Sequence, residues 1–294
     1  MLSILLAFHV LPLDLVSRPE PADSLRVPVL VYHNIQPAGT SNAIRSAELT
    51  MRPEVFAAQM QYLKVNGFHV VSLAALTDAI EGKRTLPRPA VVITFDDGRV
   101  NQYAYAFPIL KKLGFTATFF PFTHAIGRNS RYFTWKHLEE MQAAGMTIGS
   151  HTSLHVKVTQ IRQPKQWREE IEGSREVLRK RLGSAGEFFA YPWGAMSAAG
   201  DSAVRAAGYR SARSFSGGAW NGATDRFRLH AIPISDDMAA FRRAVGYPPA
   251  MAPTTRKASV PRATASGRAA AESSRETSSP QAKNLMNGRR RKVP

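Results

Sequence analysis

Two adjacent carboxylates stand at the end of one apolar run of the chain. Asp96 and Asp97 follow residues 90–95 and precede Gly98. Successive residues of a strand point in opposite directions, so neighbouring acids at a strand end can take different tasks. One can hold a metal ion while the other accepts a proton beside it. For this triplet alone, a turn with two solvated acids is the alternative interpretation.

Two histidines four residues apart follow a second apolar run. His151 and His155 come after residues 146–149. Imidazoles at this spacing can reach one ion if the segment makes a helical turn, although surface or core positions also explain such a pair. One aspartate and two histidines are a sufficient ligand set for an open metal site. Such a site polarises a carbonyl and activates water, so the combined pattern predicts metal-assisted hydrolysis.

A third cluster is aromatic. Residues 188–194 form an apolar run that ends in Pro-Trp-Gly and contains Tyr191 and Trp193. A sugar ring presents apolar C–H faces that stack on aromatic rings, so these two side chains can line a glycan groove. Core packing followed by a turn is the alternative.

The elements that must position these residues alternate between strand and helix. The expected strands cover residues 27–32, 68–71, 90–95, 115–122, 146–149, 188–191 and 209–213. The expected helices cover residues 53–66, 73–81, 102–113, 135–144, 164–182 and 196–207, and several of them are followed by a glycine that suits a C-terminal cap. This alternation predicts an α/β fold with a parallel sheet, either open or closed into a barrel. In both architectures reactive groups lie at the carboxyl ends of the strands.

The composition of the chain limits which groups can act in catalysis or bind a metal. The chain has 294 residues, of which 44% are hydrophobic, enough for one good core. It contains no cysteine, which excludes disulfides, thiolate metal ligands and a cysteine nucleophile. Any metal must therefore be held by histidine, aspartate or glutamate.

The two ends of the chain differ from its middle. Residues 1–24 begin with about a dozen apolar residues and are expected to be a signal or apolar segment, which favours export to the periplasm, cell envelope or medium. Residues 25–247 are expected to form the catalytic domain. Residues 248–294 carry ten Lys and Arg against two Glu, a net +8 of the total +17, and are expected to be a disordered basic tail. Such a tail can contact an anionic surface, whereas specific recognition of nucleic acid is not expected.

Three motifs together resemble a known family. Thr-Phe-Asp-Asp-Gly at 94–98, Ser-His-Thr-Ser-Leu-His at 150–155 and Tyr-Pro-Trp-Gly at 191–194 are similar, in this order, to the first three motifs of the polysaccharide deacetylase family. This family is also called the NodB homology domain or carbohydrate esterase family 4. Residues 28–35, 56–63 and 107–120 resemble its branch that deacetylates poly-N-acetylglucosamine.

The resemblance implies a distorted seven-stranded (β/α) barrel that removes acetyl groups from N-acetylated, or sometimes O-acetylated, sugars. Carried over by position, Asp97, His151 and His155 would bind the metal, most commonly zinc, with cobalt or nickel as alternatives. Asp96 would take a proton from the attacking water. The backbone N–H of Trp193 would help to stabilise the oxyanion.

The chain departs from the family pattern at two places. Many members carry an arginine that orients the catalytic aspartate where this chain has Ala190. The late motif that supplies a general-acid histidine is also incomplete. His33 is the preferred acid and His230 the second choice, which is otherwise expected to contact the substrate together with Tyr191 and Trp193.

Two other functions remain open from the sequence. One is hydrolysis of a non-sugar amide or cyclic imide, which the aromatic cluster disfavours. The other is a non-catalytic glycan-binding relative, which the intact acid and histidine pairs disfavour. The sequence does not select the polymer, its linkage, or N- over O-deacetylation.

Overall fold

A computed structural model describes residues 24–40 and 49–246. The predicted apolar segment at 1–24, except Ser24, and the predicted tail at 248–294 lie outside the described residues, and so does residue 247 at the expected domain boundary. Among the helices described, none combines the length and the apolar character needed to cross a bilayer.

A parallel sheet forms the centre of the fold. Its strands lie in the order β12, β2, β6, β7, β8, and β5 pairs with the first residues of β6. The bounds are β2 (Val29–Tyr32), β5 (His69–Val70), β6 (Ala90–Asp97), β7 (Thr118–Pro121), β8 (Thr147–Ile148) and β12 (Ile232–Pro233). Every pair in this sheet is parallel, so all carboxyl ends meet at one edge.

A second parallel pair continues this arrangement. It consists of β9 (Phe188–Ala190) and β10 (Ser211–Arg213). Single backbone bridges join Ser150, just after β8, to Phe189, and Arg213 to Leu229, just before β12. The predicted α/β class is confirmed. The ladders recorded among the described residues do not close, so the closed seven-stranded barrel stays a prediction.

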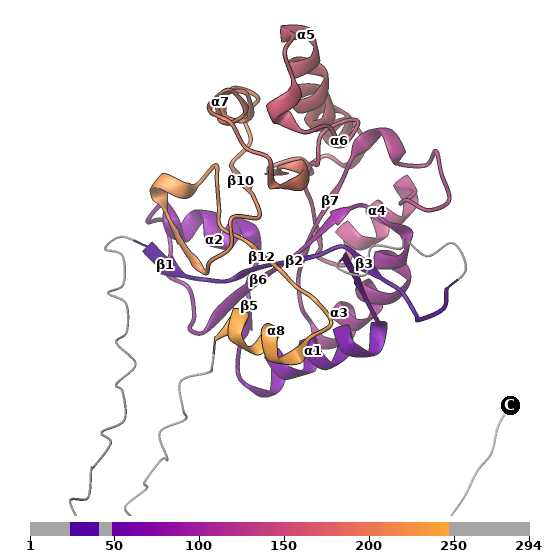
Figure 1. Cartoon of the computed structure of the whole chain (residues 1–294), viewed down its shortest axis with the longest axis vertical. Coiled ribbons are helices and arrows are strands. Elements are labelled where there is room, and N and C mark those ends of the chain that lie inside the picture. The colour runs from indigo at the N-terminus through magenta and orange to yellow at the C-terminus, as the bar shows by residue number, and fades with distance from the viewer. Residues whose placement is uncertain (1–23, 41–48, 247–294) are drawn as a thin grey trace, which may run out of the picture. The chain divides into compact units, whose positions relative to one another are not determined.

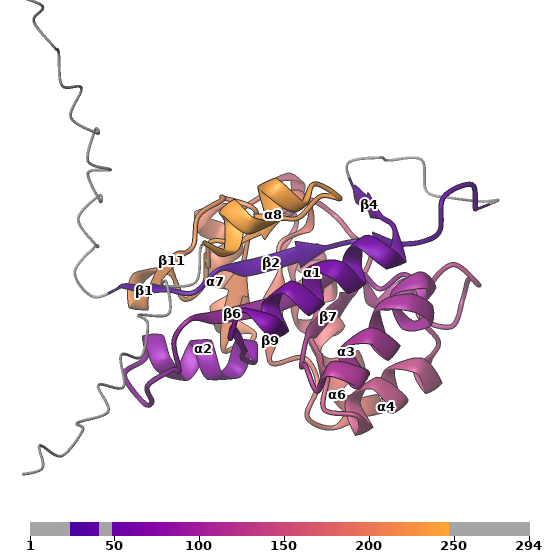
Figure 2. The same cartoon turned by 90° about the horizontal axis from the view of Figure 1, so that it is seen from below.

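Helices surround the parallel strands (Figures 1 and 2). They are α1 (Pro53–Val65), α2 (Leu73–Ile80), α3 (Phe107–Leu113), α4 (Trp135–Ala143), α5 (Pro164–Trp167), α6 (Ser174–Leu182), α7 (Ala198–Ala206) and α8 (Met238–Val245). The predicted helix at 102–113 begins with the π-helical turn η2 (Gln102–Ala106), and the one at 164–182 contains the π-helical turn η5 (Arg168–Gly173). Helix α8 was not predicted.

Short strands at the periphery were also missed by the sequence analysis. They are β1 (Ser24–Arg26), which pairs antiparallel with β11 (Trp220–Gly222), and β3 (Asn34–Ile35), which pairs with β4 (Thr50–Met51). Strand β12, at the edge of the central sheet, was not predicted either.

The strand period decides which side chains meet at the carboxyl edge. In β6, Ile93 and Phe95 pack in the larger core with α1 and α3, whereas Val92 packs in a second core on the other face of the sheet. Val31 of β2 belongs to this second core as well. Side chains two positions apart on a strand point to the same face, so Asp96 points to the same face as Val92, and His33 to the same face as Val31. The two polar side chains therefore leave their strands on the same face.

Candidate active site

The end of β6 separates its two carboxylates. Asp96 is fully buried, and Asp97 is 8% exposed. Asp97 has a φ of 70° and is followed by Gly98, also at 70°. A side chain on Gly98 would meet the backbone of Pro121, with 2.8 Å from its Cβ to the Pro121 Cα. This turn therefore needs a glycine, and it directs the Asp97 carboxylate toward the loop that follows β8.

The two histidines come together through a loop. Residues 151–155 are not helical, and Thr152 and His155 have φ values of 66° and 61°. The predicted helical turn is therefore wrong, although the predicted meeting of the imidazoles is found. The ring centroids of His151 and His155 lie 4.8 Å apart, and His155 Nε2 is 3.3 Å from Asp97 Oδ1.

Glu170 holds this loop in place. It is 2% exposed and lies in η5. Its Oε2 accepts hydrogen bonds from the backbone N–H groups of Ser153 at 3.0 Å and Leu154 at 2.9 Å. The sequence analysis assigned no role to Glu170, because it stands in a helical pattern between the acids Glu169 and Glu172. Only burial distinguishes it from them.

Asp97, His151 and His155 form a candidate metal site. Each offers one ligand atom, and these atoms lie within 4.8 Å of one another. His151 Nδ1 is 2.7 Å from the carbonyl oxygen of Ala190, which can only accept, so Nδ1 carries the hydrogen and Nε2 presents its lone pair. One carboxylate and two imidazoles suit zinc and neighbouring transition ions. The residues present therefore fit the metal that the sequence predicted.

The charge states also suit metal binding. Burial lowers the pKa of His151 to about 4, against the opposing effect of Asp96. Burial alone would raise the pKa of Asp97, but the hydrogen bond with His155 and the proximity of His151 hold it well below its ordinary value. At neutral pH the site therefore presents a neutral imidazole and a carboxylate, the forms in which both residues bind metals.

Asp96 has one oxygen paired and one oxygen without a partner. Oδ1 accepts a hydrogen bond from the guanidinium of Arg213. Oδ2 is buried and has no hydrogen-bond partner among the described residues. It lies 3.8 Å from His33 Nε2 and 4.0 Å from His151 Nε2. An unpartnered buried carboxylate oxygen is costly, so its position beside the metal ligands indicates a place for water or substrate.

Arg213 supplies the arginine that the sequence motif lacks. It is fully buried and pairs with Ala190 in the parallel ladder of β9 and β10. Its guanidinium carbon lies 5.0 Å from the ring centre of Phe120 and 5.4 Å from that of Phe215. The only sequence signal was an arginine at the end of an apolar strand, and the sequence analysis did not use it.

His33 lies beside Asp96 because two strand ends are tied together. The side chain of Gln102 donates to the backbone oxygens of His33 at 2.7 Å and Asp96 at 2.5 Å. Burial lowers the pKa of His33. Asn101 in turn donates to Asn34 at 3.3 Å. Gln102 and Asn101 thus have structural hydrogen bonds at this end of the sheet.

The structure does not bring His230 to the aspartate pair. Its neighbours Leu229 and Ala231 face the second core, so the His230 side chain points to the other face. There, its Nδ1 is 2.7 Å from Ser216 Oγ, and its Nε2 is 4.0 Å from Asp225. These contacts give no support to its predicted role at the substrate.

The aromatic cluster divides into a buried and an exposed member. The Tyr191 hydroxyl donates to Asp201 at 2.9 Å, and the ring is fully buried, so these contacts give no support to its predicted contact with the substrate. Trp193 is 54% exposed. Its ring centre lies 4.1 Å from that of His155, and Lys157 Nζ lies 5.3 Å from it. Trp193 is therefore available to stack on a ligand at the metal site.

Backbone strain is concentrated in the same place. Among the described residues, four that are not glycine have positive φ: Asp97, Thr152, His155 and Trp193. Each such conformation costs free energy and persists only where the surroundings enforce it. Three of the four carry groups assigned here to ligand binding, which is typical of a functional site.

An α/β fold with acids and histidines at the carboxyl ends of its strands defines a hydrolase with a candidate metal site. The family model for polysaccharide deacetylases matches residues 83–212. These residues include the aspartate pair, the histidine pair and Trp193, but neither His33 nor Arg213. Over these residues the chain is similar to the polysaccharide deacetylase family, and the relatives and structures that it matches are carbohydrate deacetylases, which hydrolyse non-peptide carbon–nitrogen bonds.

Individual relatives agree with this placement. The poly-beta-1,6-N-acetyl-D-glucosamine N-deacetylase of Staphylococcus epidermidis is 29% identical over 195 residues, which is 62% of this chain and 67% of the relative. The deacetylase PplD of Streptococcus pyogenes, solved in complex with acetate, has a TM-score of 0.68 and 27% identity, over 73% of this chain and 94% of that structure. IcaB from Ammonifex degensii has a TM-score of 0.65 and 26% identity, over 76% of this chain and 97% of that structure.

Proposed function

We propose that this protein removes acetyl groups from an N-acetylglucosamine-type polysaccharide or oligosaccharide by metal-dependent hydrolysis. The observation that carries the proposal is the position of Asp96 Oδ2, a buried oxygen without a partner beside the cluster of Asp97, His151 and His155. The relative from Staphylococcus epidermidis, which is named for this type of substrate, supports the choice of sugar.

The two aspartates have different roles in this proposal. Asp97, His151 and His155 would hold a divalent cation, with zinc preferred for this donor set and cobalt or nickel as substitutes. When bound, the cation supplies Lewis acidity to the acetyl carbonyl and to water. Asp96 accepts the proton as water attacks the carbonyl carbon. The Arg213 guanidinium donates to the other oxygen of Asp96, which orients this base.

Two groups complete the reaction. The backbone N–H of Trp193 donates to the oxyanion that develops on the carbonyl oxygen. The C–N bond then breaks, and His33 passes the proton that Asp96 accepted to the departing nitrogen, so that acetate and a free amine leave. His33 suits this role because its Nε2 faces the same Asp96 oxygen. The indole of Trp193 provides an exposed face on which a sugar ring can stack.

The experiment is acetate release from N-acetylglucosamine oligomers linked β-1,4 and β-1,6. Metal-stripped protein is assayed before and after addition of zinc, cobalt or nickel. We expect no release without metal, restored release with it, and a preference for one linkage. If metal binds and neither series releases acetate, the same protein is tested on small cyclic amides and for glycan binding. Activity on the cyclic amides, or binding without hydrolysis, would replace the proposal.

The proposed place of action is outside the cytoplasm, as expected from the apolar residues at the start of the sequence. Fractionation of the source cells tests this independently of the reaction. Protein found in the cytoplasm alone would contradict export without affecting the proposed chemistry.

A further inference from the structure

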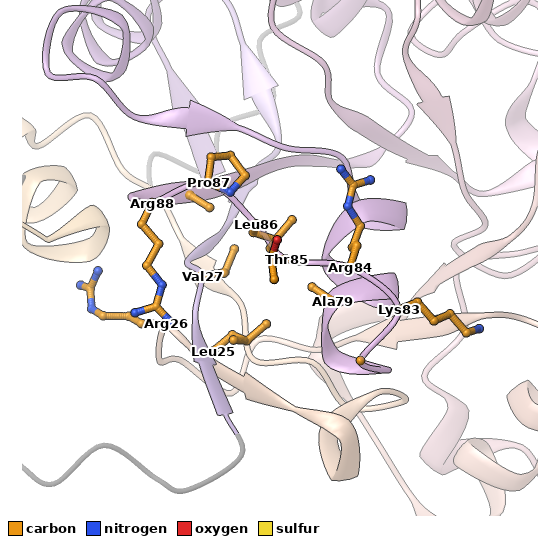
Figure 3. A pocket seen from close by; sticks show the side chains of 12 residues that line it. Leu25, Arg26, Val27, Ala79, Lys83, Arg84, Thr85, Leu86, Pro87 and Arg88 are labelled. Atoms are coloured by element: carbon orange, nitrogen blue, oxygen red, sulfur yellow. The ribbon is translucent and has the colours of Figure 1, made fainter.

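A cavity of about 480 Å³ lies at the amino ends of the strands. Its wall combines β1, the end of α2 and the loop from Gly82 to the start of β6 (Figure 3). Pockets that hold small molecules are typically about 300–1,000 Å³. This cavity is therefore large enough for a ligand.

The cavity is separate from the active site. Ala90, the first residue of β6, lines the cavity, whereas Asp96 near the end of the same strand belongs to the active site. Six residues of extended chain span about 20 Å. None of the residues assigned to catalysis or metal binding lines the cavity.

Basic side chains surround the cavity. Figure 3 shows Arg26 and Arg88 together on one side, and Lys83 and Arg84 on the other. No acidic residue lines it. Lys83 is paired with Glu81 at 2.7 Å, but Arg84 and Arg88 have no ion-pair partner within 4.0 Å among the described residues. Their charge is therefore free to attract an anion.

Between these cations the wall is apolar. Leu25, Val27, Leu86 and Ala90 line it, and all four pack in or against the second core. They cannot turn away from the cavity without losing core contacts. A ligand that matches both features carries a phosphate or similar anion next to an apolar group, since arginine recognises phosphate through two parallel hydrogen bonds.

We propose that this end of the protein binds an anionic phospholipid at a bilayer surface. The lipid phosphate lies at Arg26 and Arg88, and the glycerol and upper acyl chain lie against Leu25 and Leu86. Arg84, on the other side of the cavity, attracts the anionic surface. The active site, at the opposite end of the strands, then faces away from the bilayer. This proposal does not depend on the substrate proposed above.

The last described residues of the chain lie near the cavity, which supports contact of this end of the protein with a membrane surface. Arg26 Nη1 donates to the backbone oxygen of Val245 at 3.1 Å, and Gly246 lies against the same guanidinium. The sequence that follows has ten Lys and Arg against two Glu from residue 248 onward. Gly246, the last described residue, thus lies beside the cavity. Basic residues next to an anionic bilayer strengthen binding to it.

The test uses full-length protein and compares two double variants that remove the same charge. Arg84→Gln with Arg88→Gln changes the cavity, and Arg179→Gln with Lys180→Gln changes exposed positions on α6. Sedimentation with phosphatidylglycerol-containing vesicles measures affinity. We expect the cavity pair to weaken binding roughly 10- to 30-fold, the control pair less than about threefold, and pure phosphatidylcholine vesicles not to bind. Soluble dihexanoyl phosphatidylglycerol should compete, and inorganic phosphate at equal concentration should not.

Several results would overturn the proposal. Equal losses in both double variants would mean that binding is general attraction by positive charge. Equal competition by inorganic phosphate would mean a simple anion site. Binding of the soluble lipid without binding of vesicles would mean a site for a soluble organophosphate. Acetate release is measured in parallel, and we expect it to be unchanged in both variants.

Discussion

Arg213 lies directly opposite Ala190 in the parallel ladder of β9 and β10, and its guanidinium donates to Asp96. Neighbouring positions of a parallel ladder direct their side chains to the same face of a sheet. The arginine that is absent from position 190 is therefore replaced by one on the adjacent strand, and Asp96, the proposed catalytic carboxylate, has a guanidinium partner.

Replacing Arg213 by Gln should reduce kcat by about 100-fold, because a carboxylate that is no longer oriented is poorly placed to take the proton. Urea unfolding of the variant, measured in parallel, distinguishes this role from simple loss of stability. Arg210→Gln, at a surface position paired with Asp78, is the control.

The double variant Ala190→Arg with Arg213→Ala tests the exchange of positions directly. It should recover part of the activity lost in Arg213→Ala alone, since either strand can deliver the guanidinium to Asp96. Unchanged kcat in Arg213→Gln would show that Asp96 does not need this partner.

Asp96→Asn should separate catalysis from metal binding. The amide keeps the shape of the side chain but cannot accept the proton, so turnover should fall by about 1,000-fold or more while the protein still binds one metal ion. His151→Ala should instead lose the metal, because it removes a ligand. Metal content by elemental analysis and acetate release are measured on both proteins. Normal turnover of Asp96→Asn would disprove its assignment as the base.

Substitutions of His33 and His230 should affect kcat differently. His33→Asn should lower kcat by about 100- to 1,000-fold, since it removes the proposed acid beside Asp96. His230→Asn should leave kcat within about twofold, because its side chain contacts Ser216 instead of the site. Steady-state kinetics on the same oligomer decide between them. A larger loss for His230→Asn would reverse the assignment.

Glu170→Ala should weaken metal binding although Glu170 is not a ligand. Its removal leaves the amides of Ser153 and Leu154 without their acceptor and loosens the loop that ends at His155. Loss of groups that orient metal ligands typically costs about 10- to 100-fold in affinity. Competition with a zinc chelator measures the effect, and Glu172→Ala on the same turn is the control. Equal affinities in both variants would mean that the loop holds its shape without Glu170.

The metal-free protein should lose stability in mild acid because of His151. Its pKa is lowered to about 4 in the folded protein, below the ordinary value of 6.5, so between these values the unfolded chain binds more protons. Stability should therefore fall as pH decreases from 6.5 to 4, by about 3 kcal/mol at most. Urea unfolding at several pH values measures this slope. His151→Asn should flatten it, and an equal slope in the variant would assign the effect to other groups.

Local patterns in the sequence were sufficient for much of the fold. The alternation of apolar strands and amphipathic helices predicted the α/β class and seven of the strands that surround the site, because these periods reflect which side chains must be buried. Helices α1, α2 and α4 begin at the predicted residues and end within one residue of the predicted positions. By contrast, α8, β12 and the four peripheral strands were not predicted.

The metal ligands could also be named from the sequence, since two acids and two histidines at predicted strand ends must approach one edge of a parallel sheet. Only the tertiary structure decided the rest. Strand pairing placed Arg213 opposite Ala190, burial distinguished Glu170 from the acids around it, and the direction of alternate side chains separated His33 from His230. Each of these depends on contacts between residues far apart in the chain, which no local pattern encodes.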